Sequence, residues 1–189
     1  MTVREAAGHF RRLAEVNPGA SAPVLPPPGD EESFCASVLD YVWGIVADQK
    51  RYAAAARCCA DAFTAHPQLL AGPPTRHRYH AAGAAARAGC GQGRDAADLD
   101  EESRAGFRRQ ARDWLGAELE ARRRLLGQEP GQVLAVARDL QDWLWDSPFA
   151  GVRGPDALAR LPEPEREAWQ QLWTDIADTL ARAVEMLPR

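Results

Sequence analysis

Two histidines and a cysteine form the first pattern with the chemistry of a binding site. His77 and His80 are three residues apart in a segment predicted to be helical, so they share one helix face and could reach one metal ion. Cys90 follows further along the chain. A zinc site needs a fourth ligand, however, and this spacing fits no standard zinc signature. We therefore predict no metal site and no cofactor.

The glycine-rich segment GCGQG (89–93) superficially resembles a loop that holds phosphate. It matches neither GxGxxG, because position 94 is arginine, nor GxxxxGK[ST]. It also follows a predicted helix, whereas those loops follow a strand. Glycine tolerates positive φ, so the segment is predicted to end the helix and form a tight turn.

No pattern of catalytic residues is recognisable in the chain. The kinase signatures (a glycine-rich loop followed by a VAIK-type lysine, HRD and DFG) are absent, and Lys50 is the single lysine. The serines show no accompanying His and Asp pattern for acyl transfer, and no paired-carboxylate site stands out. We predict a non-enzymatic protein. An enzyme whose site forms between helices without a motif stays open as an alternative.

The elements that position these residues are predicted to be helices. Prolines and glycines separate segments of helical apolar spacing, and Val, Ile, Thr and Tyr never gather into the alternating runs of a strand. The predicted helices cover about 3–16, 31–48, 52–65, 75–88, 101–126, 131–146, 155–161 and 163–187. Residues 1–30 are predicted to form an N-terminal helix and a proline-rich linker, and residues 31–189 a single all-α domain.

Large apolar residues recur on one face of each long helix and predict the core. Burying each such side chain stabilises the fold by roughly 1.5–3 kcal/mol. On the helix over 101–126 and the two helices that follow it, the predicted core residues are Phe107, Ala111, Trp114, Leu115, Leu119, Val133, Val136, Leu140, Trp143, Leu144, Trp169, Leu172, Trp173, Ile176, Leu180, Val184 and Leu187. The charged residues of the 101–126 helix are typical of a solvated face.

Residues 36–67 partly match the tetratricopeptide repeat (TPR), a pair of antiparallel helices. Tyr52, Ala55, Ala62 and Pro67 occupy the positions where the second helix of the repeat has an aromatic residue, two small residues and a terminating proline. Small residues let the two helices approach closely. The first helix matches less well, because Trp43 stands where the repeat has a small residue.

Longer motifs extend the match. Three long motifs follow one another along the chain: KRYAAAARCCADAF (50–63), HRYHAAGAAARAGCGQGRDAADLDEESRAGFRRQARDWLGAEL (77–119) and DSPFAGVRGPDALARLPEPEREAWQQLWTDI (146–176). Together they resemble the C-terminal TPR region of serine/threonine protein kinases from planctomycete bacteria, over about residues 33–180. The sequence departs from that family at His80, Gly83 and Arg87, where the family tends to have Asn, Cys and an apolar residue.

The resemblance implies an all-α fold, a TPR-like helical hairpin continued by a bundle of longer antiparallel helices. It also implies a kinase-associated scaffold that binds a protein or peptide, or another domain or subunit, without the kinase domain itself. A structural oligomerisation module is the alternative.

Two groups of residues are predicted to contact a partner. Asp40, Tyr41 and Gln49 are polar positions on the first helix of the hairpin, where a concave groove would lie. The triplet Arg122, Arg123 and Arg124 could meet an acidic partner.

Composition excludes several classes of protein. Of 189 residues, 46% are hydrophobic, which is enough for a core, and the net charge of −4 is unlike that of the usually basic nucleic-acid-binding domains. No run approaches the roughly 20 apolar residues of a membrane span. The four cysteines include no CxxC and are predicted to be free thiols in a reducing compartment. We expect a cytoplasmic protein that binds neither nucleic acid nor membrane.

Overall fold

The computed structural model describes residues 49–65, 67–70 and 76–187, and within these ranges it contains helices and no strand. The all-α prediction is confirmed. The helices are α3 (Tyr52–Ala65), α4 (Arg76–Gly89), α5 (Glu101–Gln128), α6 (Val133–Trp143), α7 (Pro155–Leu158) and α8 (Glu163–Glu185). Short 3-10 helices lie at Pro67–Leu70, Pro130–Gln132 and Ser147–Val152.

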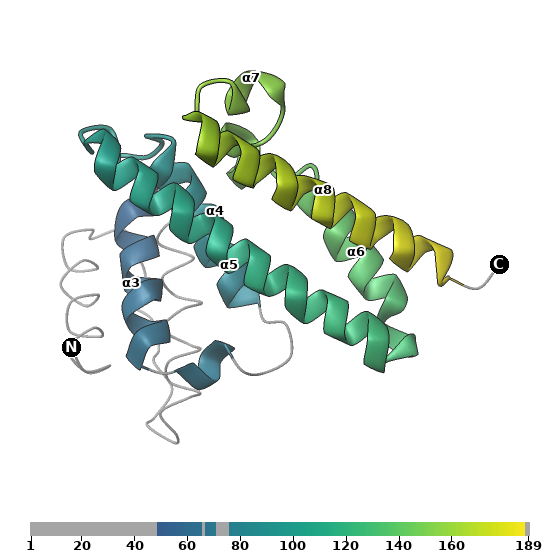
Figure 1. Cartoon of the computed structure of the whole chain (residues 1–189). Coiled ribbons are helices and arrows are strands. Elements are labelled where there is room, and N and C mark those ends of the chain that lie inside the picture. Colours follow the sequence, from purple (N-terminus) through teal and green to yellow (C-terminus); the bar gives the residue numbers. More distant parts are fainter. Residues whose placement is uncertain (1–48, 66, 71–75, 188–189) are drawn as a thin grey trace.

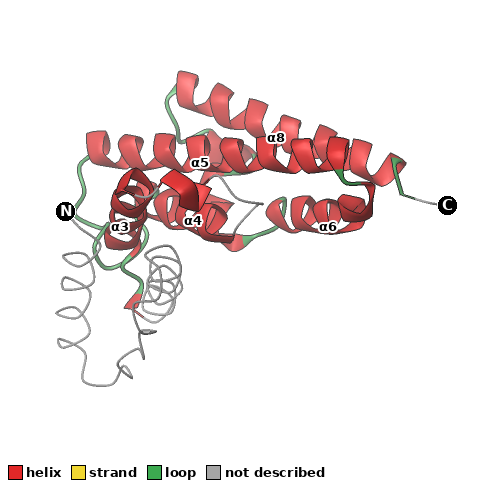
Figure 2. Ribbon diagram, turned by 90° about the horizontal axis from the view of Figure 1, so that it is seen from below, coloured by secondary structure: helices red, strands yellow, loops and turns green. Residues whose placement is uncertain are grey.

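Helix α5 forms the spine of the bundle (Figure 1). Its 28 residues span about 42 Å. Helices α3 and α4 pack near its first half, and α6 lies along its second half (Figure 2). Helix α8 runs in the same direction as α5, and α6 runs opposite to both (Figure 1).

Local signals explain where α5 begins. The Asp100 side chain accepts a hydrogen bond from the Ser103 backbone N–H at 2.8 Å, which satisfies one of the unpaired donors of the first turn. Glu101 and Glu102 follow in that turn, where the helix dipole favours acids. The helix ends at Gln128, just before Pro130.

Small residues let α4 lie close against its neighbours. Its buried residues include six alanines, all at most 1% exposed (Ala81, Ala82, Ala84, Ala85, Ala86 and Ala88). At Gly89 an added Cβ would lie 2.8 Å from the Arg108 backbone nitrogen. Any side chain at position 89 would therefore collide with the backbone of α5.

Aromatic residues fill the core between α4, α6 and α8. Tyr79 stacks on Trp143 with ring centroids 5.0 Å apart, and Phe149 contacts Trp173 edge-on at 5.8 Å. The Trp173 indole N–H donates to the Val152 carbonyl at 2.8 Å. The buried tryptophans thus anchor the second half of the chain, as the sequence predicts.

Gly83 and Arg87 of α4 each have a local packing role. A Cβ at Gly83 would meet the Pro148 side chain at 2.9 Å, so glycine leaves room for the 3-10 helix that packs there. Arg87 lies over the Tyr52 ring and donates to its hydroxyl at 3.1 Å and to Ser147 Oγ at 3.1 Å. Both positions therefore support the packing of α4.

The predicted first helix of the TPR hairpin, 31–48, lies outside the described residues. The predicted second helix of the hairpin, α3, has the predicted bounds. Ala53, Ala55 and Ala56 of α3 are buried, and α3 packs against α4.

Candidate functional site

The GCGQG segment ends α4 and forms a turn. The Gln92 N–H donates to the Arg87 carbonyl at 2.9 Å and the Gly91 N–H to the Ala88 carbonyl at 3.0 Å. Gly91 has φ of +70°, so this is the Schellman arrangement that closes a helix on a left-handed glycine. The prediction of a helix end and tight turn is confirmed.

The same loop then closes the start of α3. The Asp95 carboxylate accepts hydrogen bonds from the Ala53 and Ala54 N–H groups at 3.3 and 2.8 Å, which caps a helix over forty residues earlier in the chain. Gly93 has φ of +99°, and a Cβ there would lie 2.6 Å from the Lys50 carbonyl oxygen. The loop residues therefore hold the start of α3 in place, a role that the sequence patterns did not predict.

The charged residues of α5 include a buried ion network. Glu118 is 0% exposed and lies between Arg78 Nη1 at 3.3 Å and Arg122 Nη1 at 2.8 Å. Arg122 also contacts Asp139 at 2.9 Å and lies over the Trp143 ring. The expectation of a solvated charged face is therefore wrong at Arg108, Glu118 and Arg122, which lie on sides of α5 that neighbouring elements cover.

Burial dominates the electrostatics of Glu118. Loss of water raises the pKa of its carboxyl above the ordinary value, although Arg122 and Arg78 pull in the opposite direction. The network joins α4, α5 and α6, and it is a packing feature, not a site open to a ligand.

The nucleophilic side chains are also held inside the fold. The described cysteines are free thiols, and Cys58 and Cys59 are buried. Burial raises the pKa of Cys59 to about 12 and that of Cys90 to about 11. Burial and a hydrogen bond to Asp146 raise the pKa of Tyr79.

The two histidines of the sequence analysis lie in the first two turns of α4, and both have interaction partners. In the described part of the chain no three His, Cys, Asp or Glu side chains come together in a way that could hold a metal ion.

The predicted partner-binding residues have different positions. Asp40 and Tyr41 lie outside the described residues, and Gln49 is half-buried just before α3. Arg122 is 7% exposed and bound in the buried network, so its guanidinium is not offered to a partner. Arg123 is half-buried and donates to Thr179 Oγ1 at 3.0 Å, which leaves Arg124 as the exposed member of the triplet.

Three exposed apolar residues lie at the start of α6 and the end of α8, and these two helix ends are at the same end of the bundle (Figures 1 and 2). Leu134 of α6 is 48% exposed, and Val184 and Met186 at the end of α8 are 53% and 49% exposed. We call these three residues the end surface. Helical spacing placed Val184 in the core stripe, and that expectation is wrong.

The side of α8 that each residue occupies explains the end surface. Ala183, in the last turn, is 0% exposed, and Leu187 packs against the core just after the helix. Val184 and Met186 therefore lie on the side of this turn that faces water. Trp145, after the other end of α6, is a further exposed aromatic residue.

None of the helices within the described ranges has the length and apolar character needed to cross a membrane. Comparison with known protein families, with curated proteins and with solved structures found no match to this chain.

Proposed function

We propose that this chain is a non-catalytic helical interaction module of the cytoplasm, and that a protein partner docks on the end surface. The resemblance of its motifs and their order to the C-terminal TPR region of planctomycete kinases supports a scaffold role. The TPR-like spacing of Tyr52, Ala55, Ala62 and Pro67 supports a hairpin between α3 and the preceding segment.

The observation that carries the proposal is the exposure of Leu134, Val184 and Met186 at one end of the bundle. Each is a large apolar side chain about half open to water. Their removal from water in a complex would be favourable, and exposed apolar residues on two neighbouring helix ends offer a place for such a contact.

The state of the nucleophilic groups supports the absence of catalysis. A thiol with a pKa of about 11, as at Cys90, carries almost no thiolate at neutral pH and is a poor nucleophile. Arg108, the most extensively paired cation of the described chain, is held by Glu165 and Glu101. These groups stabilise the fold and are not poised for reaction.

The end surface also supports a second candidate, self-association. A two-fold symmetric dimer would place the end surfaces of two copies against each other and cover the same three side chains. Light scattering separates the two candidates, because self-association predicts a dimer that becomes a monomer in the double variant Leu134→Glu/Val184→Glu.

Affinity capture from a lysate of the source cells tests the leading proposal. Three baits are compared: the wild type, Leu134→Glu/Val184→Glu, and the control Gln170→Glu/Ala177→Glu, which adds the same charge at exposed positions of α8. We expect a protein that the wild type and the control retain and that the end-surface variant loses. Equal recovery by all three baits, or no enrichment by any, would reject docking at this surface.

A further inference from the structure

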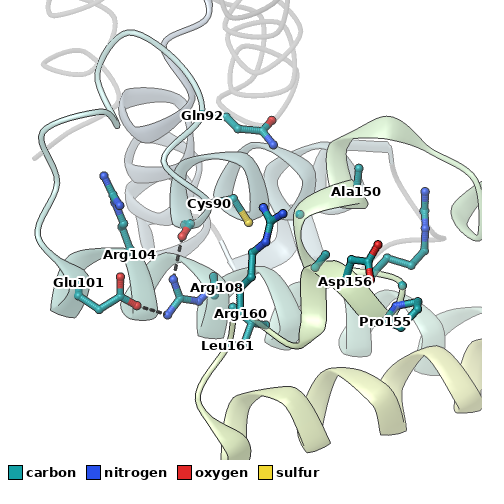
Figure 3. Close-up of a pocket in the computed structure, with 15 residues that line it drawn as sticks. Cys90, Gln92, Glu101, Arg104, Arg108, Ala150, Pro155, Asp156, Arg160 and Leu161 are labelled. Carbon is teal, nitrogen blue, oxygen red and sulfur yellow. Dashed lines mark hydrogen bonds and ion pairs between the residues drawn. The ribbon is translucent and has the colours of Figure 1, made fainter.

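A pocket of about 620 Å³ opens at the other end of the bundle, near the start of α5 (Figure 3). Its walls are the loop after α4, the first turns of α5 and the segment around α7. The lining includes four arginines, Arg104, Arg108, Arg153 and Arg160, and two acidic residues, Glu101 and Asp156. This volume lies in the range of small-molecule sites.

Arg108 forms the base of the pocket and is fully paired. Its Nε donates to Glu165 Oε2 at 2.6 Å, Nη2 to Glu101 Oε1 at 2.6 Å, and Nη1 to the Gly89 carbonyl at 2.9 Å. The bonds to Glu165 and Glu101 raise the pKa of this guanidinium despite its burial. Arg108 and its two carboxylates therefore carry a net charge of −1 between them, and Arg108 has no charge left over for a ligand.

The other three arginines have no such carboxylate partner. Arg104 donates Nη2 to the Ala97 carbonyl at 2.8 Å, a neutral acceptor, and its Nε is buried without any acceptor. Arg160 is exposed and makes no ion pair with any residue that the structure describes.

Arg153 is less available to a ligand. Its Nη1 donates to the Trp143 carbonyl at 2.8 Å, its guanidinium lies over Trp173, and Asp146 attracts it. Asp156 is the one remaining carboxylate of the lining. The four arginines and two acidic residues of the lining give a net charge of +2, or +1 when Glu165 behind Arg108 is included, in a chain whose net charge is −4.

The positions of the unpaired groups suit an anion with several oxygens. In Figure 3 the side chains of Arg104 and Arg160 extend in a similar direction, and Arg108 lies between them. A planar guanidinium pairs well with phosphate oxygens, and the terminal nitrogens of Arg104 and Arg160, not the enclosed Nε of Arg104, would make these contacts. A phosphate group offers three terminal oxygens, whereas one carboxylate offers two.

We propose that this pocket binds a small ligand through a phosphate group, with Arg104 and Arg160 as the residues that contact it. The site goes beyond the proposed docking function, since it lies at the opposite end of the bundle from the end surface (Figure 1). Glu101 and Asp156 at its walls disfavour a long polyanion, whose further charges they would repel.

Calorimetric titration of the full chain at low salt tests the site. The probes are inorganic phosphate, glycerol 3-phosphate and succinate, so that free phosphate, a phosphate ester and a dicarboxylate are distinguished. We expect one saturable site for a phosphate probe and weaker or no binding of succinate. Tighter binding of glycerol 3-phosphate would identify an ester as the ligand, and tighter binding of inorganic phosphate would identify the free ion.

Charge-matched variants locate the site. We expect Arg160→Gln and Arg104→Gln each to weaken phosphate binding by about tenfold or more, the loss typical of a charge-assisted hydrogen bond. The control Arg124→Gln removes the same charge from an exposed position of α5 outside the pocket. It should leave affinity unchanged.

Arg160 is exposed, so its variant keeps the test valid even if Arg104→Gln perturbs the loop. The proposal is overturned if no phosphate probe shows saturable binding. It is also overturned if succinate binds more tightly, or if Arg160→Gln and Arg124→Gln reduce affinity equally.

Discussion

Removal of the Glu118 carboxylate should destabilise the fold strongly. In Glu118→Ala, Arg78 and Arg122 stay 8% and 7% exposed but lose the anion between them. Loss of one partner of a buried ion pair typically costs 3–5 kcal/mol. Arg122 keeps its contact with Asp139 at 2.9 Å, and Arg78 keeps the Ala117 carbonyl at 3.3 Å. We therefore expect a loss near the lower limit, about 3 kcal/mol.

Urea unfolding followed by tryptophan fluorescence measures this loss, because Trp143 lies beside the network. Glu118→Gln keeps an acceptor of the same shape and should cost less than Glu118→Ala. The control Glu120→Ala removes an exposed carboxylate that pairs with Arg123 on the same helix, and we expect at most about 1 kcal/mol. A loss below about 1 kcal/mol for Glu118→Ala would refute the argument that the buried network holds the three helices together.

Three further predictions concern local packing and capping. Ala55→Trp should destabilise the fold by about 1–3 kcal/mol or more, because Ala55 is buried. The control Ala65→Trp changes an exposed position of the same helix and should leave stability unchanged. Equal thermal midpoints for the two variants would contradict the packing of α3. Gly93→Ala should lower the thermal midpoint because of its φ of +99° and its contact with backbone, and Gly106→Ala, in an open position of α5, should raise stability by about 0.5–1 kcal/mol. The hydrogen bonds that Asp100 accepts from Ser103 lower the pKa of the Asp100 carboxyl. The stabilisation of the fold by this carboxylate is therefore complete above the ordinary aspartate pKa, and it is lost as the pH falls through the pKa of Asp100 in the folded protein. Asp100→Asn should keep the cap and remove this pH dependence, and an unchanged acid limb of the stability profile would contradict it.

Helix positions were predictable because their signals are local. The bounds of α3 agree with the structure because Pro67 closes the segment and alanines fill it. The helix over 131–146 begins later than predicted, because Pro130 starts a 3-10 turn, and it ends earlier, at Trp143. The hairpin itself depends on residues 31–48, so its first half stays a prediction.

The candidate sites were not predictable because their residues meet only in the folded chain. Arg122 has the sequence context of a surface residue, yet Glu118, Asp139 and Trp143 enclose it from two helices. The spacing of Val184 is that of a core residue, but Ala183 and Leu187 take the core-facing side of that turn in the folded chain. The pocket joins the loop after α4 to residues around α7, which the sequence places about sixty residues apart.

Photo-cross-linking in living source cells shows whether a protein docks on the end surface. A photoreactive amino acid replaces Leu134, Val184 or, as control, Gln170, which is exposed on α8 away from the end surface. If a protein partner docks on the end surface, the same protein is cross-linked from positions 134 and 184 and not from 170. Adducts from position 170 alone, or none from 134 and 184, would contradict docking at this end of the bundle.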